Sequence, residues 1–153
     1  MEFEFDKNYD LKLSELKELV LTLEQSQHLK ELGLNLKNSL FCYNKSIVDN
    51  KIIYDIILNK ENKNNFEYIP TLTLEEIISL LPDAITELHK FNNVYYHYWL
   101  RVSGVGVEYS YYDLGDDEGG NFYELEYFYS FDRLLDNAYE ALCWCLENGY
   151  KKY

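Results

Sequence analysis

The residues best suited to chemistry in this 153-residue chain are its thiols and imidazoles, and their spacing limits what each could do. Cys143 and Cys145 resemble half of a metal site, but two residues on a helix turn through about 200°, so the thiols face opposite sides. The spacing predicts one packed core cysteine with an inert neighbour. The histidines are too isolated along the chain for a proton relay, and we expect no catalytic residue: His28, His89 and His97.

Carboxylates gather in one segment, where they could offer oxygen ligands to a hard cation. Asp116, Asp117 and Glu118 lie among glycines in one turn, but their spacing is not that of a calcium-binding EF-hand loop. Glu124 and Glu126 follow at strand spacing, which puts them about 7 Å apart on one face, as in paired catalytic carboxylates. A solvated acidic turn and strand face explains them more simply. We therefore predict no metal ion and no cofactor.

An aromatic stripe is the best candidate for a binding site. From Val94 to Val102, two sets of residues alternate, which is the pattern of a strand with two distinct faces. If the set with Tyr96 and Tyr98 faces the core, the opposite face carries rigid rings of the kind found in binding hot spots. The residues predicted to face outward are Tyr95, His97, Trp99, Arg101, Tyr112 and Phe128.

Three interpretations of this stripe stay open at the level of sequence. Another layer of the same chain covers it, a partner protein or a second copy binds it, or it lines a pocket for a small ligand.

Three strands and a helix must position these side chains. Val105 to Tyr111 and Tyr123 to Tyr129 continue the alternation, with glutamates facing away from Tyr123. Ser103-Gly104 is the predicted two-residue turn before the second strand. Ser130 is expected to cap a helix whose apolar residues keep the 3.6-residue period until Gly149.

Two shorter helices are predicted upstream. Residues 22–25 (Thr-Leu-Glu-Gln) and 73–76 (Thr-Leu-Glu-Glu) both have the capping-box pattern, in which a threonine and an acidic or amide residue satisfy each other's backbone N–H groups. Gly33 and Pro82 are expected to end these helices. The pattern of residues 1–20 is ambiguous. Residues 2–6 alternate as in an edge strand, whereas apolar residues from Leu13 to Val20 recur at helical spacing.

A hairpin is predicted between the two shorter helices, from Leu40 to Leu58 with Asp49-Asn50 as its turn. Together these patterns predict an α+β fold, with an antiparallel sheet of two hairpin groups, about five strands, and about three helices packed on one face. The length fits a single domain over residues 1–153.

The charge limits the partners that the chain can bind. It has 27 acidic and 14 basic residues, and a net charge of −13. Such a field disfavours direct binding to nucleic acid or anionic membrane and attracts basic proteins. No apolar run is long enough to cross a bilayer, no signal peptide is recognised, and three cysteines cannot all pair, so we expect a cytoplasmic protein.

Two segments resemble uncharacterised small proteins encoded by tailed phages and prophages of gut bacteria. The first is Leu-Thr-Leu-Glu-Gln-Ser-Gln-His-Leu-Lys-Glu-Leu-Gly at 21–33, followed by Tyr-Ile-Pro-Thr-Leu-Thr-Leu-Glu-Glu-Ile-Ile-Ser-Leu-Leu-Pro at 68–82. The second is Leu-Leu-Asp-Asn-Ala-Tyr-Glu-Ala-Leu-Cys-Trp-Cys-Leu-Glu-Asn-Gly-Tyr at 134–150. The resemblance implies a mobile-element origin and a product that stays in the host cell, and it implies no activity or site residues.

These patterns favour a non-enzymatic protein-interaction module. On this hypothesis the acidic residues imitate a row of phosphates and inhibit a basic or nucleic-acid-binding host protein, as an anti-defence factor would. One alternative is a small-ligand-binding protein or enzyme, with Trp99 and Tyr112 stacked on a planar ligand in an aromatic-lined cleft and with Arg101 and His97 as its cationic groups. Another is a structural phage protein that forms a homo-oligomer through its aromatic residues.

Overall fold

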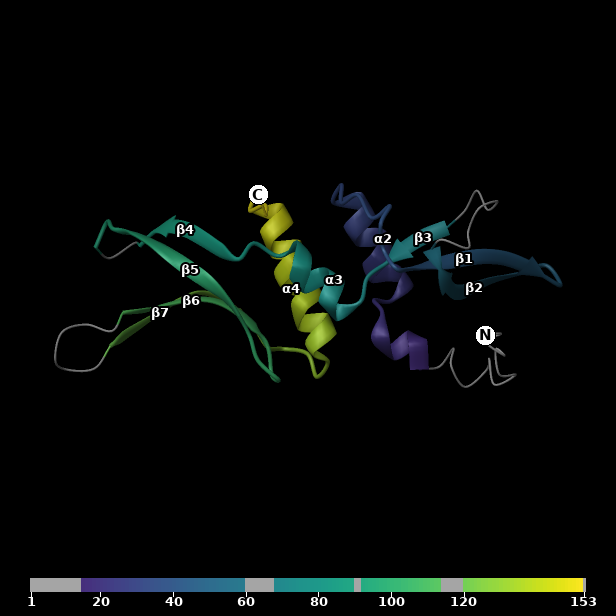
Figure 1. Cartoon of the computed structure of the whole chain (residues 1–153). Helices are drawn as coiled ribbons and strands as arrows, with labels where there is room; N and C mark the ends of the chain where they lie inside the picture. Colours follow the sequence, from purple (N-terminus) through teal and green to yellow (C-terminus); the bar gives the residue numbers. More distant parts are fainter. Residues whose placement is uncertain (1–14, 60–67, 90–91, 114–119, 153) are drawn as a thin grey trace, which may run out of the picture. The chain divides into compact units, whose positions relative to one another are not determined.

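The computed structural model describes residues 15–59, 68–89, 92–113 and 120–152 (Figure 1). The chain divides into two compact units, residues 1–73 (unit 1) and residues 74–153 (unit 2), and each is described by itself. The single domain expected from the length stays a prediction. The α+β class with antiparallel strands is confirmed, and the described strands form two sheets, one for each predicted hairpin group.

Unit 1 is built on a three-stranded antiparallel sheet in the order β2-β1-β3. The predicted hairpin is confirmed, because Asp49 and Asn50 have φ angles of 50° and 62°, the left-handed pair that a tight two-residue turn requires. The described elements of the unit are helix α2 (Leu23–Glu31) and strands β1 (Phe41–Val48), β2 (Lys51–Leu58) and β3 (Tyr68–Thr71).

The capping box at the start of α2 is confirmed. The Gln25 N–H donates to Thr22 Oγ1 at 3.2 Å, and the Thr22 N–H donates to Gln25 Oε1 at 3.0 Å. Gly33 follows the helix with a φ of +84°, as predicted. Of the ambiguous first segment, residues 15–19 are helical, and the strand pattern predicted at residues 2–6 lies outside the described residues.

Buried hydroxyl groups join α2 to the sheet of unit 1. The Tyr43 hydroxyl donates to the Leu21 carbonyl at 2.7 Å, and Thr71 Oγ1 donates to the same carbonyl at 3.2 Å. Ser26 Oγ, on α2, donates in turn to Thr71 Oγ1 at 2.9 Å. Because these groups are buried, each bond spares a polar atom the cost of desolvation, and together they fix the position of α2 on β1 and β3.

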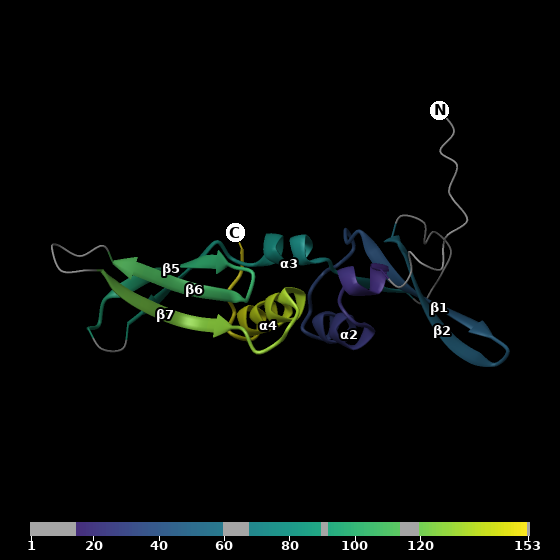
Figure 2. The ribbon, with the colours of Figure 1, turned by 90° about the horizontal axis from the view of Figure 1, so that it is seen from below.

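Unit 2 is a four-stranded antiparallel meander in the order β4-β5-β6-β7 (Figures 1 and 2). The three strands predicted from the sequence are confirmed, and β4 is added at the edge. Helix α3 starts directly after Thr73, as predicted. The described elements are α3 (Leu74–Leu80), β4 (Ala84–Leu88), β5 (Tyr95–Val102), β6 (Val107–Asp113), β7 (Asn121–Phe128) and α4 (Leu134–Glu147).

The connection from β5 to β6 differs from the predicted two-residue turn. It spans residues 103–106, and the Ser103 N–H donates to the Gly106 carbonyl at 2.9 Å. The glycine needed here is Gly106, because a Cβ atom at that position would lie 2.5 Å from the Phe128 carbonyl oxygen. The requirement comes from the neighbouring strand β7, and the local sequence gives no sign of it.

The start of α4 also differs from the prediction that Ser130 caps it. The helix begins at Leu134, and the side chain of Asn137, 1% exposed, organises the segment before it. Asn137 Oδ1 accepts from the Phe131 N–H at 3.0 Å, and its Nδ2 donates to the carbonyls of Phe131 and Val105 at 2.9 and 3.3 Å. The end of the helix at Gly149, with a φ of +76°, is confirmed.

Helix α4 packs against β6 and β7 at one end of the four-stranded sheet, and we call the face that it contacts the inner face (Figure 2). Tyr109 is fully buried there, and its hydroxyl donates to the Pro82 carbonyl at 2.8 Å. The ring of Trp144 lies 6.1 Å from that of Tyr109 and 5.8 Å from that of Phe128. Cys145 is also buried here with its thiol 3.7 Å from the Tyr109 hydroxyl, and burial raises its pKa to about 11.

A tyrosine cluster continues the inner face along the strands. Tyr96 stacks on Tyr123 with ring centroids 5.1 Å apart and lies 4.8 Å from Tyr111, while His89 meets Tyr123 edge-on at 4.8 Å. All three tyrosines are half-buried. Such ring pairs contribute about 0.5–1.5 kcal/mol beyond the area that they bury, so this part of the sheet is stabilised by its own side chains.

Substitutions at two neighbouring tyrosines test the assignment of sheet faces, because Tyr96 lies on the inner face and Tyr95 on the opposite face. We expect Tyr96→Ala to lower the free energy of unfolding by about 2–3 kcal/mol, because it removes the stacked ring. Tyr95→Ala should cost less than about 1 kcal/mol, because Tyr95 is 70% exposed. Urea unfolding followed by circular dichroism measures both values. Equal losses in the two variants would contradict the assignment of faces.

Candidate functional site

The strand register defines the second face of the four-stranded sheet, which we call the outer face. Residues directly opposite each other on antiparallel strands share a face. Trp99 pairs with Ser110, and Ser110 pairs with Glu124, so these three side chains form a row across β5, β6 and β7. Neighbouring rows contain the pair Arg101 and Glu108 and the pair Tyr112 and Phe122.

Most of the predicted aromatic stripe is on this outer face and is exposed. Tyr95, Trp99 and Tyr112 are 70%, 55% and 46% exposed, and His97 and Arg101 on the same strand are also exposed. The sequence correctly predicted that β5 alternates between a covered and an open face. These exposures show that the described residues do not cover the stripe.

Phe128 and Glu126 do not belong to the outer face, which corrects two of the predicted site residues. A register shift on β7 makes Ser110 pair with Glu124 while its neighbour Tyr109 pairs with Glu126, so one extra residue lies between the two pairings. Since Tyr109 faces α4, the residues of β7 after the shift have exchanged faces. Phe128 therefore packs against Trp144 on the inner face, and the predicted one-face pair of glutamates is wrong.

The structure adds residues that the sequence did not indicate. Phe122, 50% exposed, lies beside Tyr112, and Glu108 lies beside Arg101. The signal for Phe122 was present, because it is two residues before Glu124 and so has the same strand parity. Asp116, Asp117 and Glu118, the acidic turn of the prediction, lie outside the described residues.

Three carboxylates on β6 and β7 influence one another. Glu108 accepts a hydrogen bond at Oε1 from Ser110 Oγ at 3.1 Å, and Glu124 is paired across the strands with the same serine. Partial burial raises the pKa of Glu124, and the negative charges of Glu108 and Glu126 raise it further. The charged form of Glu124 is therefore held in an unfavourable environment that a cation would improve.

The outer face offers ring surfaces and carboxylates, and neither Trp99 nor Tyr112 lines the two pockets described for unit 2. Cavities of about 310 and 120 Å³ in unit 2 have other linings, the first between Pro82 and Tyr150 and the second near Phe131. Among the described residues, no group of three or more histidine, cysteine or acidic side chains could hold a metal ion.

Comparisons with known proteins leave the function to be argued from this geometry. A scan against protein-family models, a search of the curated proteins and a search of the solved structures return no match. Within the part of the chain that the structure describes, no helix has the length and apolar character needed to span a membrane. The phage resemblance and the cytoplasmic location stay predictions.

Glu124→Gln tests the electrostatics of the outer face. The folded-state pKa of Glu124 is raised, so its charge opposes folding at neutral pH and this cost disappears as the pH falls through that pKa. We expect Glu124→Gln to raise the melting temperature at pH 7, and the gain to vanish in acid where Glu124 is protonated. Thermal unfolding across this pH range measures the effect. If the change in melting temperature caused by Glu124→Gln is less favourable at pH 7 than at low pH, the charge repulsion is refuted.

Proposed function

We propose that this chain is a non-enzymatic protein-interaction module whose outer face binds a basic surface of a host protein. The observation that carries the proposal is the row of exposed rings and carboxylates on a sheet face that α4 does not cover. A large exposed aromatic surface on a small protein is typical of an interaction site.

Both components of the outer face favour positive charge. The faces of Trp99 and Tyr112 attract arginine and lysine side chains, with about 0.5–2 kcal/mol for each well-placed cation. Glu108 and Glu124 repel each other, so a cation placed between them relieves an existing strain and forms two new ion pairs. Arginine fits best, because its planar group stacks on rings and also binds carboxylates in a fork.

The net charge of −13 extends this preference to long range, since it speeds the approach of basic partners. The proteins that most often carry a basic groove lined with arginine are those that bind nucleic acids. We therefore propose that the partner is a nucleic-acid-binding host protein. The carboxylates would take the place of phosphates in the groove of that partner. The chain would then be an anti-defence protein, and the resemblance implies a phage or prophage origin for it.

A homo-oligomer through the outer face is a weaker candidate. Two copies would bring like charges together at Glu108 and Glu124, where the carboxylates already repel each other within one chain. Arg101 and His97 are the basic side chains that the register places on this face of β5.

Binding to a defined basic probe tests the proposal. We expect an arginine-rich peptide to bind, and Glu108→Gln with Glu124→Gln to weaken its affinity about tenfold by removing two desolvated ion pairs. The matched control is Glu31→Gln with Glu147→Gln, which removes the same charge from exposed residues at the ends of α2 and α4. Isothermal titration calorimetry at low and high salt measures both.

The control should lose no more than about twofold in affinity, the part due to net charge alone. A lysine peptide of the same length should bind more weakly than the arginine peptide, because lysine lacks the stacking contact. Equal losses in the two double variants would show that only net charge matters. Affinity that high salt leaves unchanged would exclude phosphate mimicry.

A further inference from the structure

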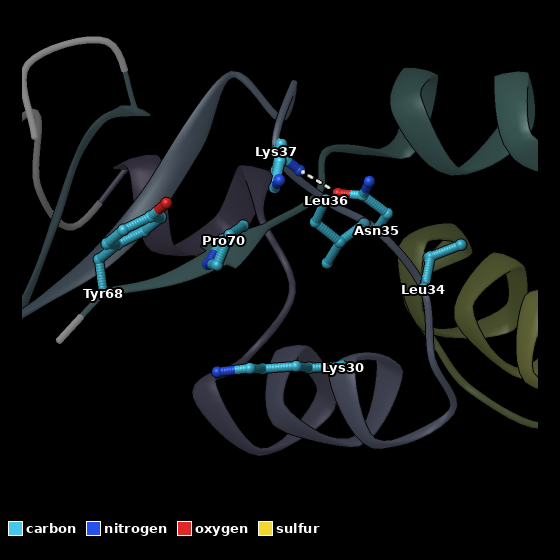
Figure 3. A pocket seen from close by; sticks show the side chains of 7 residues that line it. All are labelled: Lys30, Leu34, Asn35, Leu36, Lys37, Tyr68 and Pro70. Atoms are coloured by element: carbon cyan, nitrogen blue, oxygen red, sulfur yellow. Dashed lines mark hydrogen bonds between the residues drawn. The ribbon is translucent and has the colours of Figure 1, made fainter. Parts of the chain in front are cut away.

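A second candidate site lies in unit 1, where a pocket of about 290 Å³ opens beside α2 (Figure 3). Its lining comes from the last turn of α2, the connection from α2 to β1, and β3. The volume is at the lower end of that of small-molecule sites, which is enough for a single ring with one substituent. The lining residues are Lys30, Leu34, Asn35, Leu36, Lys37, Tyr68 and Pro70.

The charge of this lining is opposite to that of the chain as a whole. The chain has almost twice as many acidic as basic residues, yet the pocket is lined by two lysines and by no carboxylate. Lys30 and Lys37 both line the pocket (Figure 3), so an anion bound in it is attracted by two ammonium groups. A lysine pair of this kind favours a doubly charged anion.

The remaining walls are apolar, with a polar edge. The Tyr68 ring lies beside Pro70, and Leu36, 6% exposed, is also part of the lining. A flat ring is the group that stacks best on tyrosine and proline. The Tyr68 hydroxyl adds a hydrogen-bond donor to the site.

The segment that carries Lys37 is held in place before any ligand arrives. Asn35 Oδ1 accepts from the Lys37 N–H at 3.2 Å, and Asn59 Nδ2 donates to the carbonyls of Lys37 and Ser39 at 3.1 and 3.0 Å. The start of the segment is tied to α2, since the Leu34 N–H donates to the Leu29 carbonyl at 3.1 Å. Such preorganisation lowers the entropy cost of binding.

We propose that this pocket binds a small phosphate monoester with an aromatic ring, its phosphate between Lys30 and Lys37 and its ring against Tyr68 and Pro70. The site is in unit 1, and it does not depend on the function proposed for the outer face of unit 2. The proposal concerns binding and includes no chemical step.

Phenyl phosphate is the probe that carries both groups, and an NMR titration of backbone amides in the full chain is the measurement. We expect the amides of Asn35, Leu36, Lys37 and Tyr68 to shift with a common dissociation constant. Lys30→Gln with Lys37→Gln should raise that constant about tenfold, because two charge-assisted contacts are lost. The matched control, Lys17→Gln with Lys51→Gln, makes the same charge change at exposed lysines outside the pocket and should change it less than about twofold.

The related probes separate the two halves of the ligand. Inorganic phosphate and phenol should each bind more weakly than phenyl phosphate, since each lacks one group. Phosphate that binds as tightly as phenyl phosphate would overturn the ring contact, and phenol that binds as tightly would overturn the lysine contact. Unshifted pocket amides, or equal affinities in the two double variants, would overturn the site. All four lysines are exposed, so the variants should keep the wild-type unfolding midpoint, which circular dichroism checks.

Discussion

One-sided cover of the four-stranded sheet is the constraint on which the account depends. Helix α4 buries Tyr109 and the rings around Trp144 on the inner face, and no described helix of unit 2 packs on the outer face. A sheet that carried alternating polar residues would be stable in this arrangement without any partner. This sheet carries large rings on both faces, so the outer rings remain in water, where they add little to folding and are available for binding.

Features decided by neighbouring residues could be predicted from the sequence. The capping box at Thr22, the left-handed turn at Asp49-Asn50 and the glycines that end α2 and α4 depend on contacts within a few residues. The alternation of β5 is equally local, and it placed Tyr95 and Trp99 on the open face. These patterns were sufficient for the α+β class, and for the part of the candidate site that lies on a regular strand.

Features decided by partners far along the chain could not be predicted. The register shift on β7 depends on its pairing with β6, and it moved Glu126 and Phe128 to the inner face. Asn137 acts on Phe131 and Val105 through its side chain, which no capping pattern at Ser130 reveals. The unit 1 pocket joins α2 to β3 across more than thirty residues, so its two lysines looked like ordinary surface charges in the sequence.

The most direct test of the account is the solvent access of Trp99. The chain has two tryptophans, Trp99 and Trp144, so the Trp144→Phe variant keeps Trp99 on the outer face as its single tryptophan. Quenching by caesium and by iodide, at constant ionic strength and relative to free tryptophan amide, reports both exposure and local charge. An open acidic face predicts that Trp99 is quenched readily and that caesium is favoured over iodide. A Trp99 that neither ion reaches, or that iodide quenches preferentially, would contradict the account.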